Sequence, residues 1–533
     1  MVQGLLATVE LLSIRHYLLY CQLVLTIPTA SCDFAKAQEK PHAVVIGSGF
    51  GGLAAAVRLG SRGYRVNILE KLDAPGGKAY VYHQDGFTFD AGPTIITAPF
   101  LFEELWALCG KCMSDDVELR DVSPFYRIVY SDGEVFDYSG DDSAMKAQIA
   151  RWLPADVAGY ERFMAMSKAI FEVGFERLGH VPFDSIIDML KVAPSMLRLK
   201  SYRTVYGLVS KFVADPRLRV ALSFHPLLIG GNPFTAPSIY CLIAFLERKW
   251  GVHFVMGGTG ELVNGLVKLV KGQGGTLRCN AEVEQILVSD GSATGVRLRS
   301  GECIAANIVV SNADAAWTYR HLLEPKHRHR WTDRKIKRSR HSMGLFVWYF
   351  GTGRIYPDVP HHSILLGPRY GELLNDIFQR KVLASDFSLY LHRPTATDPS
   401  LAPEGCDTFY VLAPVPNLQS ETVWNEERIE TYRRAICAQL SKTVLPTLED
   451  HIVSSRVLTP QDFQDRLNSY QGAAFGMEPI LRQSAWFRPH NRSEEIKNLF
   501  LVGAGTHPGA GVPGVLSSAR VLDRVVNHAY AVA

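Results

Sequence analysis

Residues 44–56 read VVIGSGFGGLAAA, a short apolar run that enters a glycine-rich turn and continues into small apolar residues. An apolar run that ends in glycine is typical of a buried parallel strand. Alanine and leucine at helical spacing in residues 53–63 predict a helix, and residues 66–70 (VNILE) predict a second strand that ends in an acid. This β-α-β unit predicts the α/β class, with a Rossmann-like dinucleotide-binding domain.

Three glycines at fixed spacing have separate tasks in such a unit. Gly47 permits a tight turn, Gly49 lets the backbone approach a pyrophosphate, and Gly52 lets the helix pack close to the strand. The helix N-terminus then offers free N–H groups and a positive dipole end to the phosphates. Glu70 follows about 20 residues later, where a carboxylate can accept hydrogen bonds from ribose hydroxyls and would repel the 2′-phosphate of NADP.

Two glycine-rich segments follow this unit directly. In residues 75–78 (PGGK) the glycines allow close backbone approach and the lysine brings positive charge toward a phosphate; the alternative is a surface turn with a solvated lysine. Residues 89–94 (FDAGPT) are either a plain turn or backbone that lines a flat ring. Their position after the β-α-β unit favours a role at the cofactor for both.

The C-terminal segment repeats the glycine spacing without its context. Gly509-x-Gly511-x-x-Gly514 is not preceded by a strand, Pro513 lies inside the turn, and the chain ends before a second β-α-β unit. We therefore expect residues 503–514 to wrap one end of the same cofactor. A helix that starts near Val515 would point its positive end at the ring system of that cofactor.

Composition limits the other functions. The chain has 533 residues, 47% hydrophobic and 20% charged, which excludes the disordered class and predicts roughly two to four domains. The net charge of +3 gives no support for nucleic-acid binding. Nine cysteines without a pattern do not predict disulfides, and Cys109-x-x-Cys112 is half of the usual zinc ligand set, so no metal site is expected.

The chain alternates between two kinds of segment, which predicts a cofactor-binding domain interrupted twice by a mixed domain of sheet and helices. Strands are expected at residues 281–288, 294–298, 308–310 and 345–350, and a C-terminal helix at 514–528. The predicted division is an N-terminal extension (1–40), the cofactor-binding domain (41–100, 250–320 and 480–533) and a substrate- and membrane-facing domain (101–249 and 321–479).

Residues 17–28 (YLLYCQLVLTIP) are apolar but shorter than the ~20 residues that span a bilayer. One interpretation is a signal-peptide core with a cleavage site at residues 29–31. The others are a helix that lies on the protein or the membrane, and a start codon assigned too far upstream.

Seven stretches carry a closer resemblance. They are residues 44–56, 70–82 (EKLDAPGGKAYVY), 87–97 (FTFDAGPTIIT), 223–234 (SFHPLLIGGNPF), 247–263 (ERKWGVHFVMGGTGELV), 386–418 and 498–519 (NLFLVGAGTHPGAGVPGVLSSA). With them the sequence resembles the carotenoid desaturases of the bacterial and fungal phytoene desaturase type, within the flavin amine oxidase (GR2) fold group. The resemblance runs from about His42 to the C-terminus, so the first forty residues depart from it.

This resemblance implies one noncovalent FAD and a substrate such as phytoene or diapophytoene. It places Glu70 at the adenosine ribose and the Val283 backbone at the adenine. The residues expected at the cofactor are Gly47, Ser48, Gly49, Gly52, Glu70, Lys71, Gly77, Lys78, Gly92, Pro93, Val283, Gly503, Gly505, Gly511, Val512 and Pro513. The alternatives are a carotene isomerase or amine oxidase on the same fold, and a flavin-bound escort protein without turnover.

Desaturation removes a hydride, which a flavin accepts, and a proton from the neighbouring carbon. Hydride loss beside a conjugated triene leaves an allylic cation, whose adjacent proton is acidic enough that no strong base is required. The same cation would allow cis-to-trans rotation. Weak proton acceptors are His392, Asp398 and Glu404, although loop capping and salt bridges are the favoured interpretation of these residues.

A hydrocarbon substrate that resides in lipid requires a protein that reaches the bilayer, since each buried CH₂ is worth ~0.8 kcal/mol. Residues 183–212 mix apolar and basic side chains, which suits an interfacial helix on an anionic leaflet; the alternative is a helix packed on its own domain. We expect a peripheral membrane protein on the cytoplasmic side. Quinone or oxygen is the expected electron acceptor, because no second dinucleotide motif is present.

Overall fold

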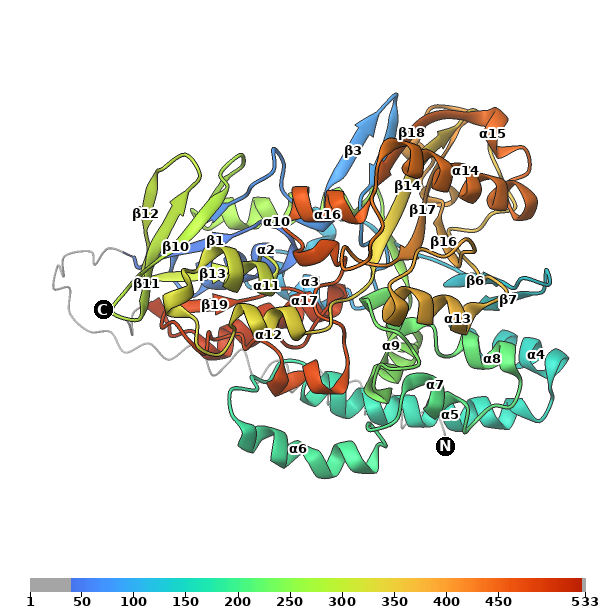
Figure 1. The fold of residues 1–533 in the computed structure, drawn as a ribbon, viewed down its shortest axis with the longest axis horizontal. Helices are drawn as coiled ribbons and strands as arrows, with labels where there is room; N and C mark the ends of the chain where they lie inside the picture. Colours follow the sequence, from blue (N-terminus) through green and yellow to red (C-terminus); the bar gives the residue numbers. More distant parts are fainter. Residues whose placement is uncertain (1–39, 530–533) are drawn as a thin grey trace, which may run out of the picture. The chain divides into compact units, whose positions relative to one another are not determined.

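The structure is a computed structural model that describes residues 40–529 (Figure 1). The apolar run at residues 17–28 therefore lies outside the described residues. From Pro41 onward the chain forms one compact unit. The division of this unit into a cofactor-binding and a substrate-facing domain stays a prediction.

A five-stranded parallel sheet contains the predicted β-α-β unit. Its order is β19–β13–β1–β2–β9. The strands are β1 (His42–Ile46), β2 (Arg65–Leu69), β9 (Thr276–Arg278), β13 (Ile308–Ser311) and β19 (Leu499–Leu501). The sheet thus joins segments from the beginning, middle and end of the chain. The fold is of the α/β class, as the sequence predicts.

Helices and a small sheet cover the parallel sheet. Helix α2 (Phe50–Ser61) packs against α10 (Thr259–Gly272) and α17 (Val512–Val525). Helices α2 and α17 each begin a few residues before the predicted start. A three-stranded antiparallel sheet, with the predicted strands β10 (Val283–Ser289) and β11 (Ser292–Leu298), contributes a separate buried cluster on β1 and β13.

A second, seven-stranded sheet forms the other half of the compact unit, on the right of Figure 1. In spatial order its strands are β18 (Ile452–Leu458), β14 (Gly344–Thr352), β17 (Asp407–Val415), β16 (Leu389–His392), β15 (His362–Leu365), β6 (Tyr126–Val129) and β7 (Val135–Tyr138). Pairing is antiparallel except between β15 and β6. The sequence predicted β14 but no strand in the region of β6 and β7.

All nine residues of strand β14 are buried, so both faces of the sheet are covered along this strand. Successive side chains of a strand point to opposite faces. Phe346, Trp348 and Phe350 pack with helix α14 (Glu426–Thr443). Leu345, Val347 and Tyr349 belong to the main core on the other face, and the first two also line the cavity described below. One face of the sheet is therefore structural and the other faces the site.

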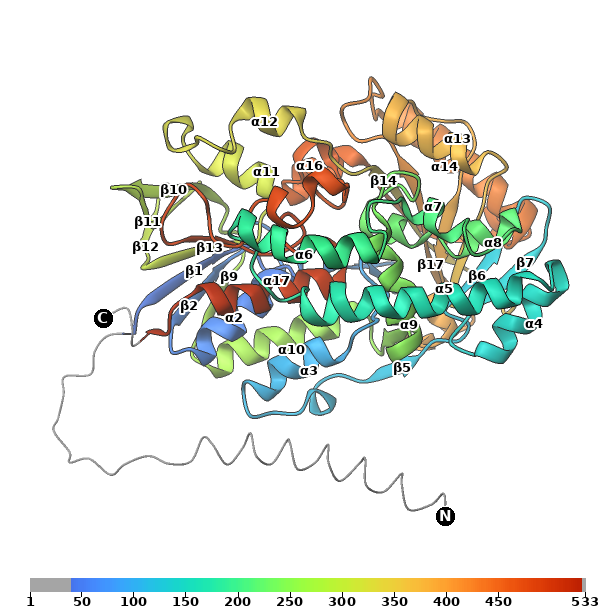
Figure 2. The ribbon, with the colours of Figure 1, turned by 90° about the horizontal axis from the view of Figure 1, so that it is seen from below.

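The helices of residues 142–250 lie below the seven-stranded sheet in Figure 1. They include α4 (Asp142–Trp152), α5 (Asp156–Phe171), α6 (Ile186–Arg198) and α9 (Leu242–Trp250). Helix α6 has no buried residue and lies at the lower edge of that view; Figure 2 shows it from below. None of the helices in residues 40–529 is both long and apolar enough to cross a bilayer.

Candidate active site

The turn after β1 is built as the glycine pattern predicts. The Gly47 nitrogen donates to the Leu69 carbonyl at 2.8 Å, which ties the turn to β2. A Cβ added to Gly52 would lie 2.1 Å from the Gly47 carbonyl oxygen, so only glycine allows α2 to pack this close to the turn. Gly47 itself has a φ of +88°, in the left-handed region that favours glycine.

Glu70 lies directly after β2 and is held by its neighbours. Its Oε2 accepts hydrogen bonds from the Ser48 nitrogen at 2.8 Å and the Ser48 hydroxyl at 2.6 Å. Its Oε1 accepts one from the Leu72 nitrogen at 2.9 Å. The Glu70 carboxylate is therefore oriented by three donors while the residue still lines the cavity.

The segment at residues 76–92 folds back against the same turn. A Cβ on Gly77 would lie 3.3 Å from the Gly49 Cα, and one on Gly92 would lie 2.1 Å from the Lys78 carbonyl oxygen. The Lys78 ammonium donates to the Ala474 carbonyl at 2.6 Å. Burial lowers the pKa of Lys78, and the nearby carboxylate of Asp314 opposes that shift.

The C-terminal glycines meet the N-terminal ones. A Cβ on Gly51 would lie 3.0 Å from the Gly503 Cα, and the Gly503 nitrogen donates to the Ser518 hydroxyl at 2.8 Å. Gly505 is close to Ala315, where an added Cβ would be 2.7 Å from the Ala315 Cβ. The two ends of the predicted cofactor site therefore lie side by side, as the sequence predicts for a single cofactor.

Two helices begin at this site without a side-chain cap. The N-cap of α2 is Gly49 and that of α17 is Gly511, and neither helix has a side-chain hydrogen bond at its first turn. Uncapped N–H groups and the positive dipole end suit a phosphate or a ring carbonyl. Both N-termini line the same cavity, so the residues present fit a long anionic dinucleotide with a planar ring.

A cavity of about 870 Å³ connects this groove to an apolar chamber. The predicted cofactor residues on its wall are Gly47, Gly49, Glu70, Lys71, Gly77, Lys78, Gly92, Pro93, Val283, Gly503, Gly505, Gly511, Val512 and Pro513. The chamber is lined by side chains such as Phe175, Met196, Leu228, Leu246, Leu345 and Leu366. Ser48 and Gly52 are not on the wall, because Ser48 bonds Glu70 and Gly52 packs on Gly47.

The sequence matches the protein-family model of the flavin containing amine oxidoreductases over residues 50–521. The neurosporene-forming phytoene desaturase of Cereibacter sphaeroides is 50% identical over 501 residues, 93% of this chain and 96% of the relative. The lycopene-forming phytoene desaturase of Pantoea ananas is 50% identical over 89% of this chain and 97% of its own. The chain belongs to the bacterial-type phytoene desaturase family. It is accordingly a flavin oxidoreductase.

Solved structures support the fold of this phytoene desaturase family member at much lower identity. A putrescine oxidase variant aligns with a TM-score of 0.61 at 13% identity, over 91% of this chain and 98% of its own. Cyclohexylamine oxidase from Brevibacterium oxydans aligns with a TM-score of 0.58 at 14% identity, over 92% and 98%. These similarities concern the fold alone.

The structure places the three weak proton-acceptor candidates of this desaturase family member in different surroundings. Asp398 accepts hydrogen bonds from the Gly257 nitrogen at 2.7 Å and the Ser400 hydroxyl at 2.6 Å, which is a capping role. Glu404 is exposed. His392 is fully buried beside His361 and His362. None of the three lines the cavity.

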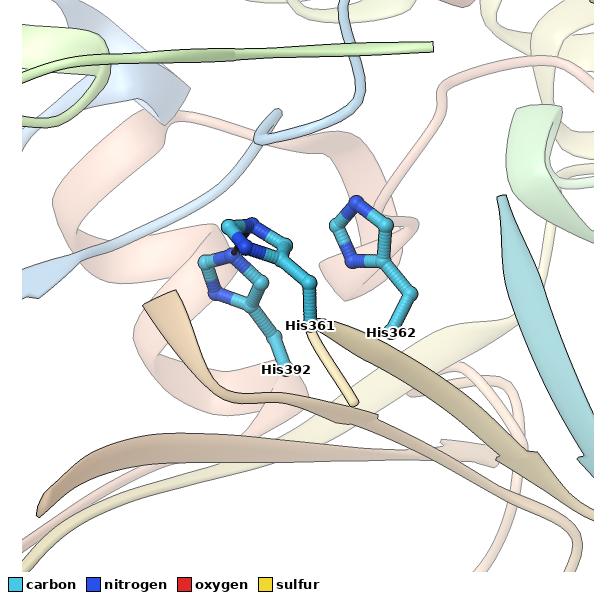
Figure 3. Close-up of side chains that lie close together, drawn as sticks. All are labelled: His361, His362 and His392. Atoms are coloured by element: carbon cyan, nitrogen blue, oxygen red, sulfur yellow. Dashed lines mark hydrogen bonds between the residues drawn. The ribbon is translucent and has the colours of Figure 1, made fainter. Parts of the chain in front are cut away.

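The three histidines form a cluster because β15 and β16 pair in a register that puts His362 opposite His392 (Figure 3). The His361 and His392 Nε2 atoms are 3.0 Å apart, and His361 Nδ1 lies 2.6 Å from the Thr397 hydroxyl. Burial lowers the pKa of His361 to about 3 and those of His362 and His392 well below their usual value.

This is the one group in residues 40–529 whose ligand atoms, within 4.8 Å of one another, could hold a metal ion. Three features disfavour a metal. The closest pair of nitrogens is already joined by a hydrogen bond, and the charged neighbour that lowers the pKa of His361 is a cation, Arg393. The group contains no carboxylate to offset the charge of an ion. We interpret the cluster as neutral, hydrogen-bonded imidazoles.

Sequence reasoning missed the polar residues on the chamber wall. The Tyr410 hydroxyl lies 2.7 Å from the Thr94 hydroxyl, and the Tyr390 hydroxyl lies 2.7 Å from His362 Nδ1. Glu247 accepts hydrogen bonds from the Tyr126 hydroxyl at 2.7 Å and bonds His225 at 3.1 Å. Apart from Tyr126 and His362, these residues fall in stretches that carry the family resemblance, but no local pattern indicates which of them meet.

Proposed function

We propose that this chain desaturates phytoene to neurosporene or lycopene in carotenoid biosynthesis, with FAD as its flavin. The observation that carries the proposal is the continuity of one cavity, whose first part is a dinucleotide groove and whose second part is an apolar chamber. An apolar chamber beside a flavin suits a hydrocarbon. The identity of 50% to neurosporene- and lycopene-forming enzymes supports the same substrate.

The predicted residues would hold FAD along the groove in a definite order. Glu70 would accept hydrogen bonds from the adenosine ribose, next to Val283 at the adenine. The N-terminus of α2 would face the pyrophosphate. The N-terminus of α17 and the backbone of Gly92 would lie along the ring system. When bound, the flavin supplies the hydride acceptor.

The chain's own residues position the hydrocarbon and exclude water. Most of the chamber wall is aliphatic or aromatic, which would protect an allylic cation formed there from attack by water. Such a cation makes the adjacent proton strongly acidic, so a weak acceptor suffices. It also lowers the order of the central double bond, and cis-to-trans isomerisation would therefore accompany desaturation. Isomerisation of phytoene by the protein without FAD would contradict this coupling.

Helix α6 supports access from a membrane. Met189, Val192 and Met196 line the cavity. On the remaining surface of the helix, Ile187 is 58% exposed and Leu190 is 65% exposed. Helix α6 thus has apolar side chains both on its cavity side and on its exposed side. Such a helix suits a passage between the chamber and lipid. Basic residues in this helix and shortly after it in the sequence suit the anionic cytoplasmic leaflet. They are Lys191, Arg198, Lys200, Arg203 and Lys211.

The proposed acceptor of the electrons removed from the substrate is a lipid-soluble quinone or oxygen. Gly511 and Gly514 of the second glycine pattern line the same cavity as the first pattern, which supports one cofactor site and no separate site for NAD. A quinone shares the lipid phase with the substrate. Purified protein in liposomes with a quinone, with oxygen alone and with neither distinguishes the two acceptors by the rate of repeated turnover.

Expression in a phytoene-accumulating bacterium tests the function, with chromatography of the pigments as the readout. Neurosporene or lycopene is the expected product. Anaerobic addition of phytoene and, separately, of putrescine to the purified flavoprotein then separates the alternatives. Bleaching of the flavin by phytoene alone supports a desaturase. Bleaching by the amine alone indicates an amine oxidase, and bleaching by neither indicates an isomerase or an escort protein.

A further inference from the structure

The proposed reaction leaves one proton inside an apolar chamber for every double bond formed. One C–H bond breaks and its electron pair leaves with the hydride to the flavin; the electrons of the neighbouring C–H bond form the new double bond, and its proton must leave. A proton is not stable in a medium that cannot solvate it. A path of hydrogen-bonding groups from the chamber wall to solvent is therefore needed.

The described residues contain such a path. Its inner end is at Tyr390 and Tyr410, whose ring centroids are 5.8 Å apart. The Tyr410 hydroxyl lies 2.7 Å from the Thr94 hydroxyl, and all three residues line the cavity. The Tyr410 hydroxyl also lies 3.4 Å from the Gly92 carbonyl oxygen, which places the path beside the segment expected at the ring system. Burial raises the pKa of Tyr390 well above its usual value, so this phenol stays neutral and can both accept and donate.

Behind Tyr390 the path continues through the histidine cluster. The Tyr390 hydroxyl lies 2.7 Å from His362 Nδ1. The relay uses the tautomer in which this hydroxyl donates, and neutral His362 then carries its proton on Nε2. At the far end His361 Nδ1 lies 2.6 Å from the Thr397 hydroxyl, and His361 Nε2 lies 3.0 Å from His392 Nε2. The relay uses the tautomers in which His361 Nδ1 donates to Thr397 and His392 Nε2 donates to His361. His392 Nδ1 is then an acceptor. In this set of tautomers, the N–H group of each ring lies on the side of the next group toward Thr397.

The remaining gap has complementary ends. His362 Nε2 and His392 Nδ1 are buried and have no hydrogen-bond partner among the described residues. One is a donor and the other an acceptor in the tautomers above. One nitrogen from each ring can be chosen so that the three lie within 4.8 Å of one another. The relay requires one water that bridges His362 Nε2 and His392 Nδ1. Thr397 at the outer end is only partly buried, whereas His362 and His392 are fully buried.

We propose that Tyr390, His362, His392, His361 and Thr397 form a relay that carries the proton released by the substrate to solvent. The proton bonds to the Tyr390 oxygen as the Tyr390 O–H proton passes to His362 Nδ1. His362 then releases its Nε2 proton toward His392, His392 to His361, and His361 to Thr397 and water. Each group ends neutral, because it loses one proton for each that it gains.

The neutral state of the cluster suits this role. A histidine that kept the proton would stop the relay, and burial disfavours the charged imidazole at all three positions. The cationic neighbour Arg393 also disfavours charge, although it is itself paired with Asp407 at 2.9 Å. No carboxylate lies in the cluster to trap the proton. The relay rests on the proposed desaturation, because only that reaction supplies the proton.

The test uses both ends of the relay in the full-length holoenzyme. Tyr390→Phe removes the inner hydroxyl, and Thr397→Val removes the outer one, away from the cavity wall. Product formation is measured in a single anaerobic turnover in liposomes, where bound FAD is the oxidant and reoxidation does not limit the rate. Both variants are expected to slow product formation at least ~10-fold with unchanged FAD content. Thr397→Ser keeps the hydroxyl and should retain the wild-type rate, so the comparison with Thr397→Val isolates the effect of the hydroxyl at this partly exposed position.

Tyr432→Phe is the matched control, since Tyr432 is buried on the opposite face of the seven-stranded sheet and should retain the wild-type rate. Full activity of either Tyr390→Phe or Thr397→Val would overturn the relay. Loss of turnover in Glu247→Gln with normal turnover in Tyr390→Phe would move the proton exit to Glu247. Stoichiometric metal in the wild type that is absent from His361→Gln would make the cluster a metal site instead. Failure of the wild type to convert phytoene would refute the proposed function and not the relay alone.

Discussion

Ser48 donates two hydrogen bonds to one oxygen of Glu70, from its nitrogen at 2.8 Å and from its hydroxyl at 2.6 Å. The first residues of the glycine turn and the acid at the end of β2 are thereby joined into one unit. The bonds fix the direction of the carboxylate before any ligand is present. Such preorganisation reduces the entropy lost on binding.

Glu70→Gln is expected to weaken FAD binding. The amide NH₂ would have to face either the two donors of Ser48 or the Leu72 N–H, and the bonds that remain would no longer be charge-assisted. Each charge-assisted bond is worth ~1.5–3 kcal/mol. The dissociation constant of FAD should rise roughly 10- to 100-fold. Titration of the apoprotein with FAD, followed by fluorescence quenching, measures it. The exposed Glu284→Gln serves as the control, and equal affinities of the two variants would contradict the role of Glu70.

Gly52→Ala should destabilise the protein and lower its FAD content. The new Cβ would lie 2.1 Å from the Gly47 carbonyl oxygen, and such overpacking typically costs ~1–3 kcal/mol or more. Gly272→Ala is the matched control, because that helical position in α10 has nothing within 4 Å of an added Cβ. Alanine there should stabilise the helix by up to ~1 kcal/mol. Thermal melts with the ratio of flavin to protein absorbance report both effects.

Leu190→Glu should weaken binding to anionic liposomes. Leu190 is 65% exposed on α6, and a carboxylate there would remove apolar contact and oppose the charge of the lipid. Val423→Glu changes a residue that is 68% exposed but lies outside α6, and it should bind like the wild type. Flotation in a density gradient gives the bound fraction. Equal flotation of all three proteins would contradict a membrane role of α6.

The buried histidines should make the protein less stable in mild acid. Their pKa is lowered in the folded state, so the unfolded chain binds more protons below about pH 6.5 and the free energy of unfolding falls as the pH drops. Each histidine should cost about 1.4 kcal/mol at pH 5.5. Asp90 opposes this in part, because burial raises its pKa to about 6 and its folded form gains a proton in the same range.

Denaturant unfolding at pH 7.5 and pH 5.5 measures this loss. His361→Gln removes one of the groups, so its free energy of unfolding should change less between the two pH values than that of the wild type. His83→Gln alters an exposed histidine and should leave the difference unchanged. An identical pH response in His361→Gln and the wild type would show that His361 is not buried in neutral form.

The sequence alone determined the fold class and most of the cofactor groove. The strand, turn and helix at residues 44–56 are contiguous, and local backbone geometry dictates glycine at Gly47 and Gly52, so the pattern is readable without tertiary information. Strands β10, β11, β13 and β14 were predicted for a similar reason, since each is a short run with its own apolar pattern. The residues predicted at the cofactor stay a prediction, although the cavity brings most of them together.

Only the tertiary structure decided what faces the chamber. His362 and His392 meet because two strands pair in one register, and Tyr410 reaches Thr94 across a sequence separation of 316 residues. Burial, cavity walls and hydrogen-bond partners depend on contacts between distant segments, which no local pattern encodes. For the same reason β6 and β7, which join the edge of a sheet built from later residues, were missed.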